Sequence, residues 1–572
     1  MHRRPAISST LLSGLLLVLL PVWGCVPDRP DRLDFVEDPA TTTEVTGAAE
    51  RAAAGGSDEG PQREEDHLHE HDPGPEALGE VGRVEFPVSC GPEATAYFES
   101  GVAMFHSFWF PQADSAFQAA LELDPECAMA EWGRAMAQMG NPYAGAIPED
   151  RRSVAMAALD RARSLDPPTE RERGFVEAAR QLFGEGGDTD GDRRRSWERA
   201  LEELHQTHPD DPEITIFLGL ALLANAPPDD TTFVRQLRAA DLLEPLFEQR
   251  PDHPGLAHYI IHAYDAPTLA DRGLEAALSY AEIAPAAPHA LHMPSHIFTR
   301  LGMWDRSIEA NLASARASGN DWARVHPWDY LVYAYLQQGR DAEAARIVEA
   351  AEAAVSQAPS PEAAAGAYNW QAMPARLALE REDWAGAATL EIRGERAHQS
   401  VAIRHFARGV GMARTGDVQG ARAERDRLAE IESALDDAGE SYWARVVEAQ
   451  GLAVEGWTLA TEGRFDQALE RMSAAAELEE RVEKHPVTPG PLLPAREMHG
   501  EILLQAGRHG EALEAFQRVL EREPNRGRAT YYAGRAAQAL GDEVEAERYL
   551  RAYRELTARG DGTRGWTASN PR

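Results

Sequence analysis

Histidines with the spacing of metal ligands gather in one stretch of the chain. His258 and His262 are four residues apart, as are His292 and His296, so each pair lies on one face of an α-helix. A separation of 34 residues relates His258 to His292, His262 to His296, and His292 to His326. Two imidazoles on one helix can chelate a metal ion, and a second helix can complete a tetrahedral ligand set.

A period of 34 residues predicts tetratricopeptide repeats, in which helix–turn–helix units stack on one another. Equivalent positions of successive units then lie side by side. We therefore expect one divalent ion to be held by four ligands, which are His258, His262, His292 and His296.

Three further residues continue the same two rows: Asp265, His289 and His326. They are predicted to be alternative ligands, or partners that orient the imidazole rings. Nitrogen donors with a carboxylate suit zinc, copper or nickel better than calcium or magnesium. Metal affinity should fall below about pH 6.5, where an ordinary imidazole takes up a proton.

The cluster has two other interpretations, a metal-free polar groove for a peptide or anionic ligand, and ordinary packing. The sequence contains no HExxH, GxSxG or phosphate-binding Gly-rich motif, so no catalytic residue is predicted. The favoured function is a membrane-anchored binding or scaffold protein with a metal site in its concave groove. A metal-dependent hydrolase or oxidase and a metal-free peptide-binding adaptor remain alternatives, and enzymatic activity is left open.

Small and aromatic residues recur at the offsets that a tetratricopeptide repeat requires. The first unit has Gly101, Ala113, Phe117, Ala120 and Pro125, and a late unit has Gly500, Leu503, Ala512, Phe516 and Pro524. Apolar residues three and four apart fill the positions between them. Residues 86–557 are predicted to form an all-α solenoid of helix–turn–helix repeats, and residues 558–572 a loose tail.

The N-terminal residues resemble an export signal. A basic start, a short apolar run and Cys25 suggest a lipoprotein-type signal peptide over residues 1–25, with Cys25 lipidated; plain secretion is the alternative. Residues 26–85 are rich in Asp, Glu, Pro and Gly and contain the segment EEDHLHEHD, which predicts a disordered acidic linker. The protein is thus expected in the cell envelope, bound to a membrane by lipid.

Charge and cysteines limit the partners and the compartment. The chain has 57 basic and 94 acidic residues, a net charge of −37, which argues against a nucleic-acid partner. Cys90 and Cys127 are 37 residues apart, close to one repeat, so a disulfide between them is plausible in an oxidising envelope. Two buried free thiols are the alternative.

Several segments resemble a bacterial family of exported tetratricopeptide proteins. They read FPVSCGPEATAYFESGVAMFHSFWF, DPECAMAEWGRAMAQMGNP, HYIIHAYDAP, HALHMPSHIFTRLG and EKHPVTPGPLLPARE. The resemblance implies the fold and the export, and carries over no catalytic residue. Tetratricopeptide domains bind protein or peptide partners in the concave groove, and the resemblance places the histidines at groove-facing positions.

Two proline-containing segments depart from the repeat pattern. Pro294 lies inside the helix that carries His292 and His296, and predicts a shift or kink there. The segment from Lys484 to Glu497 has four prolines between two well-formed repeats. It is predicted to be a rigid connector, with a flap over one mouth of the solenoid as the alternative.

Overall fold

The structure is a computed structural model that describes residues 79–143, 145–356, 366–393, 399–561 and 564. Every described residue belongs to one compact unit, Glu65–Arg572. The predicted signal peptide, Cys25 and most of the predicted linker lie outside the described residues.

Regular structure in the described part of the chain is entirely helical. The first helices are α1 Pro92–His106, α2 Phe110–Leu123, α3 Ala128–Ala137, α4 Glu149–Ser164, α5 Glu170–Arg180, the π-helix η2 Gln181–Glu185, α6 Asp190–Thr207, α7 Pro212–Ala224 and α8 Val234–Gln249. The middle helices are α9 Pro254–Tyr264, the 3-10 helix η3 Ala270–Gly273, α10 Leu274–Ile283, α11 Pro288–His292, α12 Pro294–Arg300, α13 Trp304–Ala317, α14 Asp321–Gln337, α15 Asp341–Ser356, α16 Ala367–Glu380 and α17 Trp384–Ala388. The last are α18 Gln399–Thr415, α19 Val418–Asp437, α20 Ser441–Thr461, α21 Phe465–Glu479, α22 Ala495–Gln505, α23 His509–Arg522, α24 Gly527–Leu540 and α25 Glu543–Leu556.

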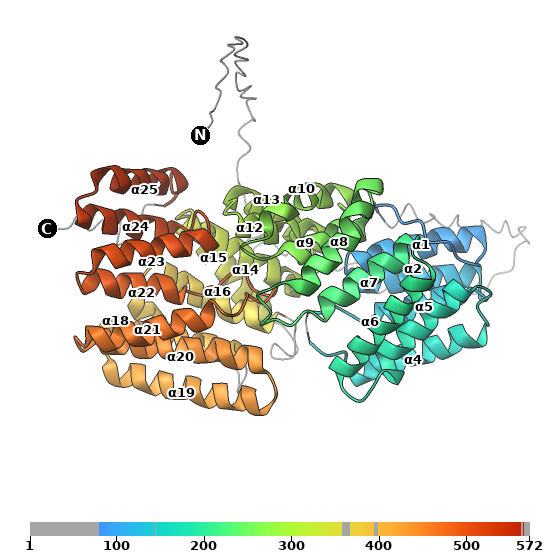
Figure 1. Cartoon of the computed structure of the whole chain (residues 1–572), viewed down its shortest axis with the longest axis horizontal. Helices are drawn as coiled ribbons and strands as arrows, with labels where there is room; N and C mark the ends of the chain where they lie inside the picture. The colour runs from blue at the N-terminus through green and yellow to red at the C-terminus, as the bar shows by residue number, and fades with distance from the viewer. Residues whose placement is uncertain (1–78, 144, 357–365, 394–398, 562–563, 565–572) are drawn as a thin grey trace, which may run out of the picture. The chain divides into compact units, whose positions relative to one another are not determined.

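Helices that follow one another along the chain pack side by side, and many alternate helices, such as α1 with α3 and α18 with α20, also touch (Figure 1). This is the packing of a helical-repeat stack, so the predicted all-α solenoid fold is confirmed. The repeat glycines have a direct packing role. A Cβ atom at Gly101 would lie 2.7 Å from the Phe117 ring, and one at Gly500 would lie 2.7 Å from the Phe516 ring.

Two hydrophobic cores fill the stack, one from residues 81–298 and one from residues 372–549. Contacts between distant helices add to them, because α9 packs on α1 and α14 packs on α24. The indole N–H of Trp304 donates to the backbone carbonyl of Asn525 at 2.9 Å. The helices that carry the histidines are thus held from several parts of the chain.

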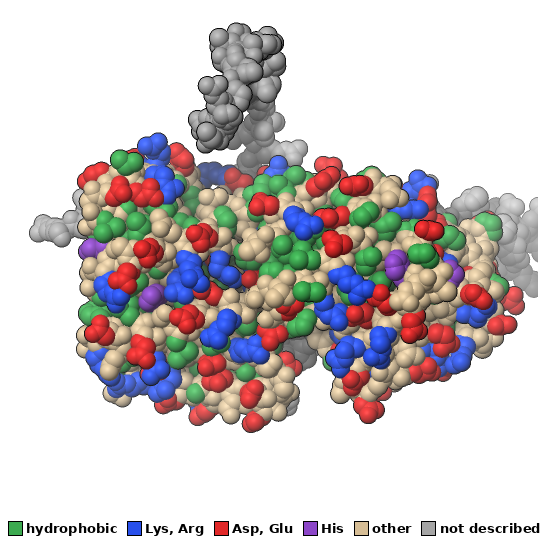
Figure 2. All heavy atoms as spheres, viewed as in Figure 1, with side chains coloured by type: hydrophobic (Ala, Val, Ile, Leu, Met, Phe, Trp, Pro, Cys, Tyr) green, Lys and Arg blue, Asp and Glu red, His purple; other side chains and the backbone are tan. Residues whose placement is uncertain are grey.

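Acidic and basic side chains lie among one another on the face drawn in Figure 2, in keeping with the many ion pairs between neighbouring helices. Within the described residues, no helix combines the length and the apolar character that a membrane span needs.

Cys90, just before α1, and Cys127, at the N-cap of α3, are joined by a disulfide bond. Replacing both with serine is expected to lower the free energy of unfolding by about 2–4 kcal/mol, because the unfolded chain loses a cross-link. Urea denaturation of the two proteins measures the difference, and the wild-type protein in reductant should match the variant. Equal stability of the oxidised wild-type protein and the variant would contradict the expectation.

Candidate metal centre

The six histidines of the sequence prediction lie together, on four helices. We call them the histidine cluster: His258, His262, His289, His292, His296 and His326. Helix α9 carries the first two, α11 the next two, and α12 and α14 one each. The kink predicted at Pro294 is a break, because α11 ends at His292 and α12 begins at Pro294.

The cluster consists of two groups of three, whose ligand atoms lie within 4.8 Å of one another. The first triad is His258, His262 and His289; the second triad is His292, His296 and His326. The four-residue set expected from the 34-residue register is therefore divided between two triads. The reason is local. His289 lies in the first turn of α11, and its ring, rather than that of His292, contacts His258.

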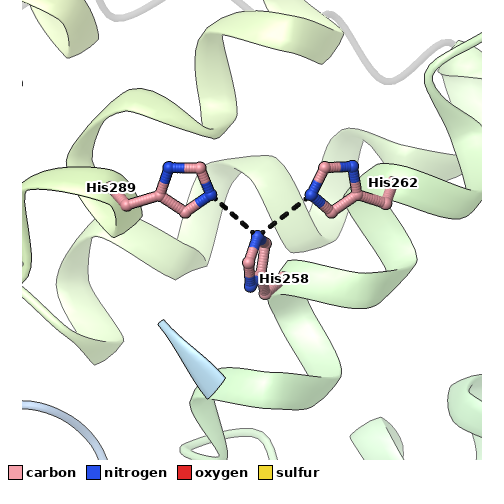
Figure 3. Close-up of side chains that lie close together, drawn as sticks. All are labelled: His258, His262 and His289. Carbon is pink, nitrogen blue, oxygen red and sulfur yellow. Dashed lines mark hydrogen bonds between the residues drawn. The ribbon is translucent and has the colours of Figure 1, made fainter. Parts of the chain in front are cut away.

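In the first triad two rings converge on one nitrogen. The Nε2 atoms of His262 and His289 each lie 3.1 Å from Nε2 of His258 (Figure 3). The Nδ1–H group of His258 donates to the backbone carbonyl of His106 at 2.6 Å. Since a neutral imidazole carries one proton, the Nε2 atom of His258 has a single lone pair directed between its two neighbours.

In the second triad, two side chains fix the proton positions. The Nδ1–H of His292 donates to Oδ1 of Asn311 at 2.6 Å, and the amide nitrogen of Asn311 donates to the carbonyl of Ser307 at 2.7 Å. The Nδ1–H of His296 donates to the carboxylate of Asp265 at 2.8 Å. Both Nε2 atoms are left with lone pairs, yet they lie 3.1 Å apart.

Two lone pairs at this distance repel each other unless a cation lies between them. Nitrogen ligands of a tetrahedral ion with bonds of 2.0–2.1 Å are about 3.3 Å apart. His326 completes this triad, and its buried Nδ1 atom has no hydrogen-bond partner. The Nε2 atoms of His292 and His296 therefore have the spacing and the protonation of metal ligands, and His326 lies within reach as a third ligand.

Asp265 links the second triad to two buried cations. Besides His296, its carboxylate accepts hydrogen bonds from Nζ of Lys484 at 2.8 Å and from Nε of Arg300 at 2.9 Å. Burial alone would raise the pKa of Asp265, but the charges of Lys484 and Arg300 hold it well below its ordinary value. Burial lowers the pKa of Lys484 to about 8 against the attraction of Asp265. Asp265 is thus an ionised, buried acceptor that orients His296, and it is not a member of either triad.

The histidine cluster holds its rings in the neutral form. Burial, followed by the neighbouring imidazoles, lowers the pKa of four members well below its ordinary value: His258, His262, His289 and His292. Burial also lowers the pKa of His296, against the pull of Asp265, and that of His326 to about 3. Neutral imidazole is the form that binds metal, so the fall in affinity expected below about pH 6.5 from an ordinary imidazole shifts to lower pH.

Aromatic side chains enclose the cluster. The Phe108 ring lies 4.4 Å from that of His258 and 5.2 Å from that of His289, measured between centroids. Phe108 has a left-handed backbone with φ of 52°, a strained conformation of the kind that gathers at functional sites. The centroid of the Tyr143 ring lies 4.4 Å from that of the His262 ring. These contacts correct the expectation of rings on an open groove wall, since His258 and His292 are 0% and 1% exposed.

The proline-rich segment is more than a connector, because it packs over the helices of the site. Lys484 reaches Asp265, and the backbone carbonyl of Thr488 accepts a hydrogen bond from the Tyr330 hydroxyl at 3.2 Å. Arg376 of α16 donates to the carbonyls of Gly490 and Pro491, both at 2.8 Å. The segment also lines a cavity of about 110 Å³ whose walls include Arg300, Tyr442, Trp443 and Lys484. The segment therefore covers one side of the hydrogen-bonded group formed by Asp265, His296 and Arg300.

A third group of possible metal ligands, which the sequence did not predict, consists of His106, Glu213 and His253. Nε2–H groups of His106 and His253 donate to the two oxygens of Glu213, at 3.2 and 2.8 Å, and all three residues are buried. Their separations of 107 and 40 residues follow no repeat period, so no sequence signal joined them. The Nε2 protons account for the contacts with Glu213, the buried Nδ1 atom of His253 has no hydrogen-bond partner, and the group supports the first triad through the backbone of His106.

Comparison with known proteins supports the repeat fold. Residues 503–566 match the family described as Tetratricopeptide repeat. No curated protein sequence matches the chain.

Three solved structures are similar to the chain at low identity. A monomeric mutant of IFIT1 with Gppp-AAAA is 12% identical, with 84% of this chain and 99% of that chain covered and a TM-score of 0.35. The APC/C hetero-tetramer Cut9-Hcn1 is 13% identical, with 81% and 79% covered and a TM-score of 0.32. Yeast Tom70 is 12% identical, with 80% and 92% covered and a TM-score of 0.29. Likenesses this distant carry nothing about the ligands of this chain. The chain is an all-helical repeat protein whose C-terminal part carries a tetratricopeptide repeat.

Proposed function

We propose that this protein binds a divalent transition metal, such as zinc, copper or nickel, in its histidine cluster. One observation carries the proposal. The Nε2 atoms of His292 and His296 lie 3.1 Å apart although the Nδ1 atoms of both rings hold the protons. A metal ion would turn this repulsive contact into a pair of coordinate bonds.

The surroundings of the rings fit that role. Imidazoles that ligate metals usually donate their second N–H group to a carbonyl, an amide or a carboxylate, which fixes the ring and its tautomer. His258, His292 and His296 do so to the His106 carbonyl, Asn311 and Asp265 respectively. A polar groove built for a peptide would have no need of these fixed tautomers.

The wider role that we propose is that of a binding or scaffold protein in the cell envelope, exported and lipid-anchored through Cys25. Stacked helical repeats present extended surfaces on which protein or peptide partners dock. The net charge of −37 disfavours nucleic acid as a partner. The metal would then be a clamp between repeats or a cargo.

A second candidate is a metal-dependent hydrolase or oxidase on the same scaffold. The number of ligands in each triad favours it, because catalytic sites supply three protein ligands and leave a fourth position open. Structural zinc sites have four protein ligands.

Metal analysis of the full-length protein, purified without a polyhistidine tag, tests the proposal. We expect bound zinc, copper or nickel in the wild-type protein and a loss of at least tenfold in affinity in the His292→Ala/His296→Ala variant. Chelation should lower the unfolding temperature of the wild-type protein, since metal at 1,000 times its Kd stabilises by about 4 kcal/mol.

The matched control removes two histidines outside the cluster, in the variant His499→Ala/His509→Ala. It should keep the metal and the response to chelator. If all three proteins hold equal metal and melt identically with chelator, the second triad is not a metal site; if the wild-type protein also holds no metal, the metal-free groove for a peptide takes the place of the proposal.

A further inference from the structure

Each triad by itself supplies a complete set of three nitrogen ligands. We infer that the histidine cluster holds two metal ions, one in each triad, and that their free coordination positions take a small anion such as hydroxide. The inference rests on the proposed metal-binding function and sets its stoichiometry and ligand.

The spacing of the rings favours two ions over one shared ion. The nitrogen contacts of 3.1 Å all lie within a triad. Where the triads face each other, the ring centroids of His262 and His296 are 6.2 Å apart and those of His289 and His292 are 6.1 Å apart, a spacing that His296 and His326 also have within the second triad, and no 3.1 Å nitrogen contact joins these pairs. One ion at bonding distance from rings of both triads would have to break the close contacts in each.

Hydrogen bonding explains the first triad no better than it explains the second. His258 offers one lone pair at Nε2, because its Nδ1 proton is donated to His106. One in-plane lone pair accepts one N–H group well, yet two imidazole nitrogens approach it at 3.1 Å. An ion at the centre of the three nitrogens satisfies all of them.

Charge balance points to the anion. Six neutral imidazoles contribute no negative charge to two divalent ions. Asp265 is the one carboxylate that hydrogen-bonds to a ring of the cluster in the described part of the chain, and it is already paired with Lys484 and Arg300. Buried charges need compensation, so an exogenous anion must supply it.

The neighbourhood offers solvent access and a partner for such a ligand. His262, His289 and His326 are partly exposed, so solvent reaches both triads. The buried hydroxyl of Tyr143 has no hydrogen-bond partner, and the Tyr143 ring lies 4.4 Å from that of His262. A metal-bound water or anion would be a partner for this hydroxyl.

Titration of the metal-free, full-length protein with cobalt(II) tests the inference. Three histidines of the predicted acidic linker, His67, His69 and His71, are first replaced by alanine, so that they bind no cobalt. The visible bands of protein-bound cobalt should grow to an end point of two ions per chain. An end point of one ion would overturn the two-ion arrangement and leave the proposed function standing, whereas an end point of zero would remove both.

Two matched variants assign the ions to the triads. His262→Gln and His326→Gln each remove one partly exposed ring from a different triad. Each variant should bind one cobalt as the wild-type protein does and the other at least tenfold more weakly. If either variant lost both ions, the two triads would form one coupled site and would not be two separate sites. If a variant does not fold, the end point of the wild-type titration decides.

Azide probes the free positions. Its addition to the cobalt-loaded protein should shift the visible spectrum with a saturating dependence on azide concentration. An unchanged spectrum would overturn the assignment of an exchangeable anion.

Discussion

Replacement of Asp265 by asparagine is expected to lower the free energy of unfolding by about 3–5 kcal/mol and to weaken metal binding at the second triad about 10–100-fold. The carboxylate is 5% exposed and lies between Lys484 and Arg300. An amide has no charge, so the variant leaves the buried Lys484 without its ion-pair partner and Arg300 with Glu483 alone. It also removes the acceptor that holds the proton of His296 on Nδ1.

Urea denaturation of the metal-free protein measures the first effect, and competition with a chelator of known affinity measures the second. Asp271→Asn is the matched control, because Asp271 carries the same group in an exposed position of η3 nearby. The control should change neither quantity. If the free energy of unfolding of the Asp265 variant fell by less than about 1 kcal/mol, the loss would be that of an exposed ion pair, and the prediction would be contradicted.

Lowering the pH from 7 to 5 is expected to destabilise the metal-free protein by several kcal/mol. The folded state holds the histidine cluster neutral, with pKa values below the ordinary one. In the unfolded chain these histidines take up protons near pH 6.5. Between the two pKa values the unfolded state therefore binds more protons, and stability falls as the pH falls, by up to about 1.4 kcal/mol per pH unit for each histidine.

The charged groups around the cluster do not titrate in this range. Asp265 is ionised in both states above pH 5, because its pKa is lowered from a value already near 4. Lys484, with a pKa of about 8, is charged in both states below pH 7. Urea midpoints at pH 7, 6 and 5 give the slope. Stability that stays constant across this range would show that the rings titrate freely and are not buried as neutral groups.

The fold could be predicted from the sequence because its signal is periodic and local. The positions of Gly101 and Phe117 recur as Gly500 and Phe516, and each glycine leaves space for the ring on the facing helix. The same 34-residue period brought five of the histidines together in the prediction, His289 was added as a continuation of one row, and the structure places all six together. Their arrangement in two triads was not predicted, because it depends on which ring of α11, His289 or His292, contacts His258.

The 34-residue period could not predict the side chains that contact the histidine rings. Asn311 of α13 bonds to His292 of the second triad, Lys484 of the proline-rich segment bonds to Asp265, and Phe108, just after α1, contacts the first triad. Lys484 and Asp265 are 219 residues apart in sequence. Contacts of this kind depend on the return of later repeats to the helices of the site, which no local pattern encodes.

Anomalous scattering tests the central claim most directly. Crystals of the full-length, untagged protein, grown with zinc or copper, would be measured on both sides of the absorption edge of the metal. We expect anomalous density at the point where the Nε2 atoms of His258, His262 and His289 converge, and at the corresponding point between His292, His296 and His326. Metal density confined to other parts of the chain, with both of these points empty, would contradict it.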